Sequence, residues 1–497
     1  MEFDFPSALI FPAVSLLLLL WLTKTRKPKS DLDRIPGPRR LPLIGNLHHL
    51  ISLTPPPRLF REMAAKYGPL MRLQLGGVPF LIVSSVDVAK HVVKTNDVPF
   101  ANRPPMHAAR AITYNYTDIG FAPYGEYWRN LRKICTLELL SARRVRSFRH
   151  IREEENAGVA KWIASKEGSP ANLSERVYLS SFDITSRASI GKATEEKQTL
   201  TSSIKDAMKL GGFNVADLYP SSKLLLLITG LNFRIQRVFR KTDRILDDLL
   251  SQHRSTSATT ERPEDLVDVL LKYQKEETEV HLNNDKIKAV IMDMFLAGGE
   301  TSATAVDWAM AEMIRNPTTL KKAQEEVRRV FDGKGYVDEE EFHELKYLKL
   351  VIKEMLRMHP PLPFLVPRMN SERCEINGYE IPANTRLLIN AWAIGRDPKY
   401  WNDAEKFIPE RFENSSIDFK GNNLEYIPFG AGRRMCPGMT FGLASVEFTL
   451  AMLLYHFDWK MPQGIKLDMT ESFGASLKRK HDLLMIPTLK RPLRLAP

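Results

Sequence analysis

Apolar positions recur with the period of an α-helix along most of this chain, so the pattern predicts a mainly helical protein. Apolar residues three and four positions apart form one face of a helix, and this spacing continues through several long segments. An uninterrupted apolar run from Met439 to Leu454 predicts a further helix. The other predicted helices cover residues 86–94, 128–140, 235–252, 285–315 and 317–331.

Patterns typical of strands occur at only a few places. Met71, Leu73 and Leu75 alternate with polar residues, as in a half-buried strand. Gly76-Gly77 and Asn377-Gly378 are turn sequences that each stand between two short strand-like stretches, so each predicts a hairpin. The two patterns together predict a mainly α fold with small β-sheets. The predicted strands cover residues 71–75, 78–83, 374–376, 379–381 and 387–393.

The N-terminal residues have the composition of a membrane anchor. Residues 5–23 carry no charge and are just long enough to cross the apolar core of a bilayer. Acidic residues precede this stretch and basic residues follow it, which by the positive-inside rule places the rest of the chain in the cytosol. A cleaved signal peptide is the alternative, but its basic start and small-residue cleavage site are absent. We therefore predict an uncleaved anchor over residues 1–23.

Beyond the anchor, the 497-residue chain shows no repeat and no long low-complexity linker, which favours one large domain. Residues 24–45 are rich in basic residues and proline, and they include Ile35-Pro36-Gly37-Pro38. Because proline fixes extended backbone, this segment predicts a stiff hinge between the anchor and the domain. The domain itself is predicted over residues 46–497.

The net charge of +12 is spread along the chain and is not gathered in blocks. Basic chains often bind nucleic acid, but this chain has no aromatic and basic module of that kind, so we expect no nucleic-acid partner. A membrane surface and an acidic protein partner explain the charge more simply. The three cysteines, Cys135, Cys374 and Cys436, have neither paired nor metal-ligand spacing, which fits a reducing compartment.

One cysteine stands in a context that predicts chemistry. Residues 429–438 read F-x-x-G-x-R-x-C-x-G, and the apolar helix that begins at Met439 follows directly. Cys436 therefore lies at the N-terminal end of a helix, where the dipole and the free amides stabilise a thiolate. A lone thiolate of this kind suits the axial ligand of a haem iron. The alternative is a buried cysteine in a loop before a core helix, which is the commoner role of a lone cysteine.

The segment around Cys436 resembles the haem-binding signature of the cytochrome P-450 monooxygenases. Further motifs of that family occur earlier in the chain, in the order in which the family has them. The resemblance implies the cytochrome P-450 fold, with haem b as cofactor and O2 and NADPH as co-substrates. Cys436 would be the ligand of the iron, in a loop framed by Phe429 and Gly438. Donors to the haem propionates are also implied, since the arginine fork suits a carboxylate. These donors are Trp128, Arg132, Arg368 and Arg434.

Two adjacent glycines lie inside the longest predicted helix. Gly298 and Gly299 each cost about 1 kcal/mol relative to alanine, so we expect a compensating role. The segment Ala297 to Ser302 resembles the oxygen-binding segment of the family, in which small residues let the helix open beside the haem. The resemblance implies that Glu300 and Thr301 are catalytic and help to deliver protons to dioxygen. The alternative for Thr301 is a hydroxyl bonded back to its own helix.

Glu354 and Arg357 form an E-x-x-R pair with the spacing of one helical turn. Such pairs are usually surface salt bridges that contribute a fraction of a kcal/mol. Glu354 and Arg357 precede Cys436 in the chain, and Arg411 lies between them and Cys436. This is the order in which the motifs of the family occur. The resemblance implies that the three residues form a buried charged network with a structural role.

The residues at the family's substrate-facing positions are nearly all apolar, although many of them could equally be ordinary core residues. An apolar lining favours a lipophilic small molecule. Segments such as Phe100 to Pro104 look like those of plant microsomal members in the terpenoid- and alkaloid-oxidising clan, which implies hydroxylation of a sesquiterpene or diterpene. The candidate substrate residues are Ile112, Phe213, Ala297, Phe364, Val366 and Phe473.

The same resemblance implies a single-pass protein of the endoplasmic reticulum membrane with a cytosolic domain. NADPH–cytochrome P-450 reductase would supply electrons, with a cytochrome b-type protein as a further donor. Two other functions stay open. A haem-thiolate isomerase or dehydratase needs neither oxygen nor reductase, but such relatives typically lose the acid–threonine pair that is intact here. A non-catalytic membrane haem-binding protein would have no need for Glu300 and Thr301.

Overall fold

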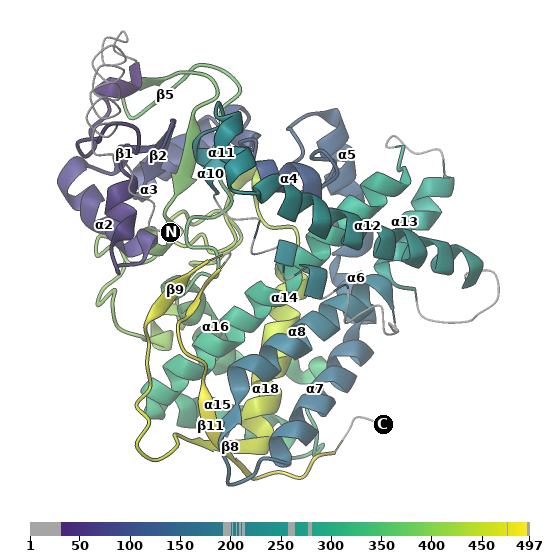
Figure 1. Cartoon of the computed structure of the whole chain (residues 1–497). Helices are drawn as coiled ribbons and strands as arrows, with labels where there is room; N and C mark the ends of the chain where they lie inside the picture. The colour runs from purple at the N-terminus through teal and green to yellow at the C-terminus, as the bar shows by residue number, and fades with distance from the viewer. Residues whose placement is uncertain are drawn as a thin grey trace, which may run out of the picture.

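Long helices form the body of the molecule, in the lower part of Figure 1. The structure, a computed structural model, describes residues 31–191, 200, 202–204, 206–207, 210, 214–256, 264–276, 281–474 and 476–494. The predicted helices over 285–315, 317–331 and 439–454 are confirmed with nearly the predicted ends. The helices of this body are α7 (Arg149–Ala164), α8 (Leu173–Ile190), α14 (Asn284–Arg315), α15 (Pro317–Phe331), α16 (Lys346–Met358) and α18 (Met439–His456).

Helix α18 lies in the centre of this body. It is apolar on nearly all sides, and every residue from Phe448 to His456 is buried, as expected of a core helix. Its side chains share one apolar cluster with Trp308 of α14, Phe331 of α15 and Met355 of α16. The long helices are therefore held by a continuous core.

A close contact between α8 and α14 explains the two adjacent glycines. A methyl group on Gly299 would lie 2.8 Å from a ring carbon of Phe182, and one on Gly298 would lie 3.0 Å from Cγ2 of Thr185. Larger residues would force the two helices apart. Helix α14 is continuous from Asn284 to Arg315, so the expected opening of the helix is not present here, and the compensating role is packing.

A four-stranded sheet lies in the upper left of Figure 1, where the N-terminal segment of the chain meets a later one. Strand β2 pairs antiparallel with β1 and parallel with β7, and β7 pairs antiparallel with β4. Separate apolar clusters cover the two faces, with Leu81 on one and Phe80 on the other. The strands are β1 (Leu70–Leu75), β2 (Val78–Val83), β4 (Arg368–Met369) and β7 (Arg386–Ile389).

Both predicted hairpins are confirmed. The first is β1–β2, and the second joins β5 (Cys374–Ile376) to β6 (Tyr379–Ile381). The predicted strand over 387–393 is only half right, because β7 ends at Ile389 and a helical turn follows, α17 (Ala391–Ile394). The side chain of Asn390 accepts a hydrogen bond from the amide of Ala393 at 3.1 Å. Asparagine is a strong N-cap, and this cap ends the strand.

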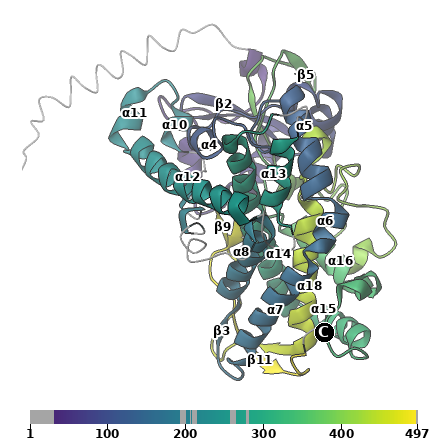
Figure 2. The ribbon, with the colours of Figure 1, turned by 90° about the vertical axis from the view of Figure 1, so that its right-hand side faces the viewer.

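The remaining helices surround the sheet and cover the upper side of the body (Figures 1 and 2). The predicted helices over 86–94 and 128–140 are present, each ending in a wider π turn, and the one over 235–252 lies inside α12. These helices are α2 (Pro56–Tyr67), α3 (Val86–Lys90), α4 (His107–Ile112), α5 (Glu126–Ile134), α6 (Ala142–Ser147), α10 (Val215–Leu218), α11 (Lys223–Ile228), α12 (Leu231–Thr256) and α13 (Leu266–Lys275).

The C-terminal part of the chain, together with Ala171–Asn172, contains strands that the sequence pattern did not predict. Helical period was expected there, which is wrong. Most of these strands have two to four residues, too few for alternation to be visible, and the six residues of β11 do not alternate between apolar and polar types. Strand β11 pairs with both β3 and β8, and β9 pairs with β10 to form a hairpin. They are β3 (Ala171–Asn172), β8 (Phe457–Lys460), β9 (Glu471–Phe473), β10 (Leu477–Arg479) and β11 (Leu484–Leu489).

The predicted anchor over residues 1–23 lies outside the described residues, as does the hinge up to residue 30. The described part of the hinge packs against the sheet, because the amide of Arg72 donates to the carbonyl of Pro36 at 2.8 Å and Ile35 is buried. In the part of the chain that the structure covers, α18 alone has the length and apolar composition to cross a bilayer, and most of it is buried in the protein.

Candidate active site

The loop that carries Cys436 folds back on itself just before α18. The amide of Cys436 donates to the carbonyl of Phe429 at 2.9 Å. Gly430 and Gly432 have φ angles of 74° and 70°, a left-handed backbone that other residues rarely adopt. A side chain at Gly432 would also collide with Asp97. The turn that presents the cysteine therefore requires the two glycines of the motif.

Cys436 presents a free thiol whose own surface is exposed. The dense protein around it raises the pKa of this thiol, whereas the amide of Gly438 and the guanidinium of Arg132 lower it. A metal ion binds the thiolate, so these two groups favour the ligating form. Burial raises the pKa of the Cys135 and Cys374 thiols as well, and neither of these side chains is exposed. Cys436 is therefore the cysteine that is open to a ligand.

Four arginines gather beside the Cys436 loop and tie it to the segments around it. Each guanidinium group donates to at least one main-chain carbonyl, so their positions are set by the backbone. Arg132 donates to Met435 at 2.5 Å, Arg368 to Ala431 at 2.8 Å, Arg434 to Ala101 at 2.6 Å and Arg103 to Val366 at 2.8 Å.

This arginine cluster, formed by Arg103, Arg132, Arg368 and Arg434, carries an excess of positive charge. Burial lowers the pKa of all four guanidinium groups, to about 10 for Arg368 and about 9 for Arg434. The neighbouring arginines lower those of Arg103 and Arg434 further. Asp97 lies 3.7 Å from Arg368 and balances part of the charge. A ligand with two carboxylates, such as haem with its propionates, fits this cluster.

Trp128 lies against the arginine cluster but uses its ring N–H elsewhere. Its Nε1 donates to the carbonyl of Ile119 at 3.0 Å. The guanidinium of Arg434 lies 4.2 Å from the centre of the Trp128 ring, and that of Arg132 lies 5.4 Å away. In this structure Trp128 therefore stabilises the two arginines by cation–π contact, and its role as a propionate donor stays a prediction.

Helix α14 packs against the first turn of α18 at Ser302, the residue after Thr301. A methyl group on Gly442, in the first turn of α18, would lie 3.7 Å from Oγ of Ser302. The Thr301 hydroxyl donates to the carbonyl of Ala297 at 2.5 Å, which is the bond to its own helix that the structural alternative predicts. The hydroxyl oxygen can still accept a hydrogen bond, so the catalytic role stays a prediction. Glu300 accepts a hydrogen bond from Ser476 Oγ at 2.5 Å.

Glu354, Arg357 and Arg411 lie together in one buried network. Arg357 donates to the two carboxylate oxygens of Glu354 at 2.7 and 2.8 Å, and Arg411 donates to Glu354 at 2.9 Å. The Glu354 and Arg357 side chains are fully buried. Arg357 also donates to the carbonyls of Gly395 and Ala404 at 2.6 and 2.8 Å. The network therefore fixes the loops that precede the cysteine motif.

The predicted substrate residues are only partly brought together. The Phe364 and Phe473 rings meet edge to face with centres 5.7 Å apart, and Phe473 is 42% exposed. Ala297 is exposed on α14. Ile112 is buried in a different apolar cluster from Phe364. The remaining two candidates are Val366, whose carbonyl accepts from the arginine cluster, and Phe213, which lies outside the described residues.

Sequence reasoning missed several residues that this geometry places at the site. Arg103 completes the arginine cluster. Asp118 and Asp293 form a pair of buried carboxyl groups, and Ser476 contacts Glu300. Only Asp293 had a signal in the sequence, because it precedes Thr301 by eight positions and so lies on the same face of α14.

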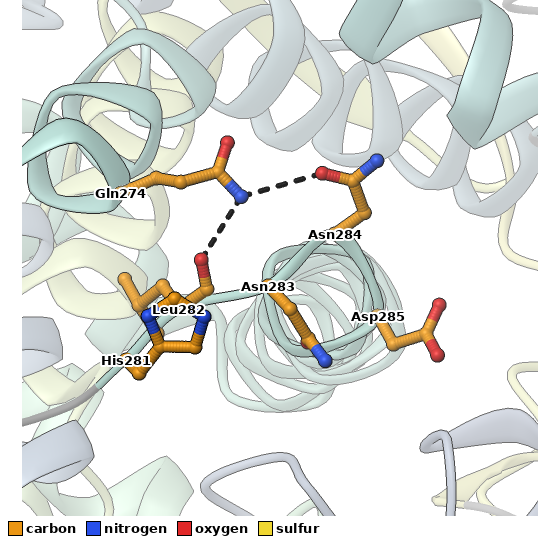
Figure 3. Close-up of a pocket in the computed structure, with 6 residues that line it drawn as sticks. All are labelled: Gln274, His281, Leu282, Asn283, Asn284 and Asp285. Carbon is orange, nitrogen blue, oxygen red and sulfur yellow. Dashed lines mark hydrogen bonds between the residues drawn. The ribbon is translucent and has the colours of Figure 1, made fainter.

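A hollow of about 400 Å³ lies at the N-terminal end of α14 (Figure 3). Gln274 bridges its rim by donating to the carbonyl of Leu282 at 2.9 Å and to Asn284 at 3.3 Å. At 1.5 Å per residue, it is roughly 25 Å along α14 from Thr301. The hollow is therefore separate from the site around Cys436.

Residues 35–486 match the family model described as Cytochrome P450. The chain belongs to the cytochrome P450 family. The match runs from the hinge to β11 and contains both the Cys436 loop and the Glu300–Thr301 segment. The chain is therefore a haem-dependent monooxygenase that uses O2 and electrons derived from NADPH, and it works with a redox partner on a lipophilic substrate.

Two plant proteins are similar to this chain over nearly its whole length. Cytochrome P450 71D10 from Glycine max is 53% identical over 94% of this chain and 93% of its own length. Premnaspirodiene oxygenase from Hyoscyamus muticus is 48% identical over 98% of each chain. Among solved structures, a zebra fish cytochrome P450 with progesterone shares the fold with a TM-score of 0.75 and 24% identity, over 88% of this chain and 100% of that one.

Proposed function

We propose that this cytochrome P450 hydroxylates a terpene hydrocarbon, a sesquiterpene or a diterpene. One observation carries the proposal: the exposed thiol of Cys436 lies just before α18, whose first turn packs against α14 at Ser302, directly after Glu300 and Thr301. The aromatic pair Phe364–Phe473 and the exposed Ala297 are apolar, which suits a hydrocarbon. The similarity to premnaspirodiene oxygenase supports the same substrate class.

The overall reaction balances as RH + O2 + NADPH + H⁺ → ROH + H2O + NADP⁺. When bound, haem supplies the iron at which dioxygen is activated, with electron density pushed from the thiolate. Cys436 would hold that iron, and the arginine cluster would hold the propionates. Glu300 and Thr301, on the part of α14 that packs against the start of α18, would pass protons on. The apolar residues orient the substrate and exclude water.

The test is product analysis. Microsomes that contain the protein are incubated with reductase, NADPH and a panel of terpene hydrocarbons that includes premnaspirodiene. We expect a hydroxylated product that requires NADPH and carries one oxygen atom from ¹⁸O2. Conversion without NADPH would instead indicate the isomerase or dehydratase alternative. Haem binding with no conversion of any panel member and no NADPH oxidation would favour the non-catalytic alternative.

For the redox partner, we propose NADPH–cytochrome P-450 reductase, with a cytochrome b-type protein as a further donor. A basic surface next to the cysteine loop supports this proposal. Arg129 and Arg433 both lie over the ring of Tyr124, at 5.7 and 5.6 Å, and both are exposed. Lys133 is exposed one turn further along α5. Charges of this kind favour encounter with an acidic protein surface.

For the location, we propose the endoplasmic reticulum membrane, with residues 1–23 as anchor, 24–45 as hinge and 46–497 as the cytosolic domain. Exposed apolar side chains on the domain suggest a second membrane contact. Tyr219 donates to the carbonyl of Leu43 at 3.3 Å and so joins two segments that carry such side chains. The exposed residues include Leu43, Ile51, Leu53, Leu224, Leu227, Ile228 and Phe233.

Deletion of Met1 to Arg26 tests the anchor. The truncated protein is expected to incorporate haem normally but to leave the membrane fraction more readily in high salt. If it folds and stays fully bound in high salt, the anchor is not the only attachment. The apolar side chains on the domain would then be responsible.

A further inference from the structure

The β9–β10 hairpin is attached firmly to helix α14. Trp308 of α14 donates its ring N–H to the carbonyl of Leu477 at 2.9 Å. Asp307, one position earlier, accepts from Nε of Arg479 at 2.8 Å. Arg479 is buried, so this ion pair is shielded from solvent. Strand β10 therefore has a fixed position relative to the helix that carries Glu300.

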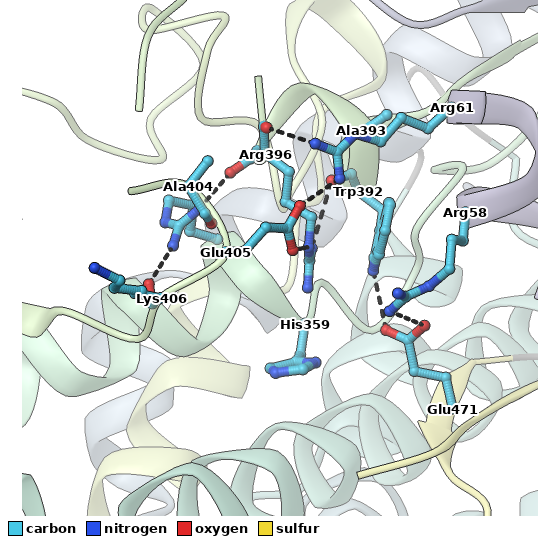
Figure 4. A network of polar contacts seen from close by, with 12 residues as sticks. Arg58, Arg61, His359, Trp392, Ala393, Arg396, Ala404, Glu405, Lys406 and Glu471 are labelled. Atoms are coloured by element: carbon cyan, nitrogen blue, oxygen red, sulfur yellow. Dashed lines mark hydrogen bonds and ion pairs between the residues drawn. The ribbon is translucent and has the colours of Figure 1, made fainter. Parts of the chain in front are cut away.

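The other strand of the hairpin, β9, is attached to helices α2 and α17 (Figure 4). Glu471 accepts from the ring N–H of Trp392 at 3.0 Å, and Arg58 lies 3.6 Å from the same carboxylate. The guanidinium of Arg396 covers the Trp392 ring at 3.9 Å. Strand β9 is therefore also held in place by contacts outside the hairpin.

Ser476 lies at the start of β10 and is only 2% exposed. Its hydroxyl donates to Oε1 of Glu300 at 2.5 Å, and the Thr304 hydroxyl lies 3.4 Å from it. A hydroxyl that donates to a carboxylate makes a short and strong hydrogen bond. Thr304 can donate to Ser476 in turn, which leaves the Ser476 proton free for Glu300. The carboxylate is therefore held by a chain of two hydroxyl groups.

We propose that Ser476 is a positioning residue that sets the orientation of Glu300 for proton delivery. The inference rests on the proposed function, since it assumes that Glu300 supplies protons. Ser476 holds the carboxylate on the hairpin side of α14, next to Thr301. The same hairpin carries Phe473, whose ring meets Phe364 at 5.7 Å. Substrate contact with Phe473 and the position of Glu300 are therefore linked through the paired strands β9 and β10.

The experiment compares five variants of the full-length holoenzyme. Ser476→Ala removes the donor, and Ser476→Thr restores a hydroxyl. Ser472→Ala is the matched control, since it lies in the same hairpin and its hydroxyl makes no hydrogen bond among the described residues. The fourth is Ser476→Ala combined with Glu300→Gln, compared with Glu300→Gln alone. The carbon monoxide difference spectrum verifies the fold of every variant.

We measure product per NADPH with the panel member that the wild type converts, and the solvent deuterium isotope effect on product formation. The loss of one hydrogen bond to a charged group is expected to lower product per NADPH by about two- to tenfold in Ser476→Ala and to increase the isotope effect. Ser476→Thr is expected to recover most of the coupling, and Ser472→Ala to behave as wild type. On the Glu300→Gln background, Ser476→Ala is expected to have no further effect.

A second readout needs no turnover. The carboxyl bands of Glu300 are assigned by infrared difference between wild type and Glu300→Gln, and they are expected to shift in Ser476→Ala. Unchanged bands, unchanged coupling, or an equal loss on the Glu300→Gln background would each overturn the role of Ser476. Absence of any product from the wild type would instead contradict the proposed function, and the infrared result would still decide the contact.

Discussion

The carboxylate of Asp293 accepts the amide N–H of Ile119 at 2.7 Å, and this contact joins α14 to the loop before α5. Asp293 also accepts from the amide of Gly120 at 3.3 Å. The carbonyl of Ile119 receives the ring N–H of Trp128 at 3.0 Å and a guanidinium N–H of Arg434 at 3.2 Å. A short chain of hydrogen bonds therefore connects the helix that carries Thr301 to the arginine cluster.

Asp293 has a second carboxyl group as its neighbour, and this pair predicts a pH dependence. Burial raises the pKa of both Asp293 and Asp118, and for Asp293 the Asp118 carboxyl raises it further. The folded protein therefore binds more protons here than the unfolded chain does. The stabilisation is complete below the unfolded pKa of 3.8 and is lost as the pH rises through the raised values.

Two replacements of Asp293 distinguish the effect of its charge on stability from the effect of its hydrogen bonds. Asp293→Asn keeps an acceptor for the two amides without a charge, so its thermal stability is expected to fall less than that of wild type between about pH 4 and pH 8. Asp293→Ala leaves both amides without this acceptor and is expected to lose about 1–3 kcal/mol at every pH. Thermal unfolding of the wild type and of both variants, measured across this pH range, checks the two expectations. A decline for Asp293→Asn that is as steep as that of wild type, or steeper, would contradict the raised pKa of Asp293.

The buried network around Glu354 predicts a large loss of stability on substitution. Glu354→Gln removes the charge that balances two arginines in a site without solvent, which is expected to cost about 3–5 kcal/mol and to lower haem content on expression. Glu325→Gln is the control, because Glu325 pairs with Lys321 at 3.8 Å on the exposed face of α15. This control is expected to unfold as wild type does. Equal behaviour of the two variants would show that the buried network contributes little.

The three cysteines give a direct test of the iron ligand. Cys436→Ala is expected to abolish the thiolate-type carbon monoxide difference spectrum of the reduced protein, because the exposed thiol is removed. Cys135→Ala and Cys374→Ala are expected to keep it, since both cysteines lie outside the loop before α18 and neither side chain is exposed. A thiolate-type spectrum without Cys436 would contradict the assignment.

Local patterns in the sequence predicted the long helices well, because helical period is visible over 15 residues or more, as in α15. They also predicted the E-x-x-R pair, whose members lie one turn apart. Ser476 and Arg103 could not be found this way, since each acts on a segment far away in the chain. The two glycines of α14 show the same limit: their spacing marks them as unusual, but only the position of Phe182 gives the reason.

Thr301 is the residue for which the functional and structural interpretations differ most. Its hydroxyl donates to the carbonyl of Ala297 at 2.5 Å, and both interpretations are compatible with this bond. If Thr301 passes on protons, Thr301→Ala is expected to bind haem and substrate normally while NADPH oxidation continues. The electrons would then leave as hydrogen peroxide, O2 + NADPH + H⁺ → H2O2 + NADP⁺, and product per NADPH would fall about tenfold or more.

Thr301→Ser is the matched control, because it keeps the hydroxyl and removes only a methyl group. It is expected to retain most of the coupling. If Thr301 only closes a bond within its helix, both variants should alter stability slightly and leave product per NADPH unchanged. Product, NADPH and peroxide measured together in the three proteins separate these outcomes. An unchanged ratio in Thr301→Ala would remove this residue from proton delivery and leave Glu300, held by Ser476, as the group to examine.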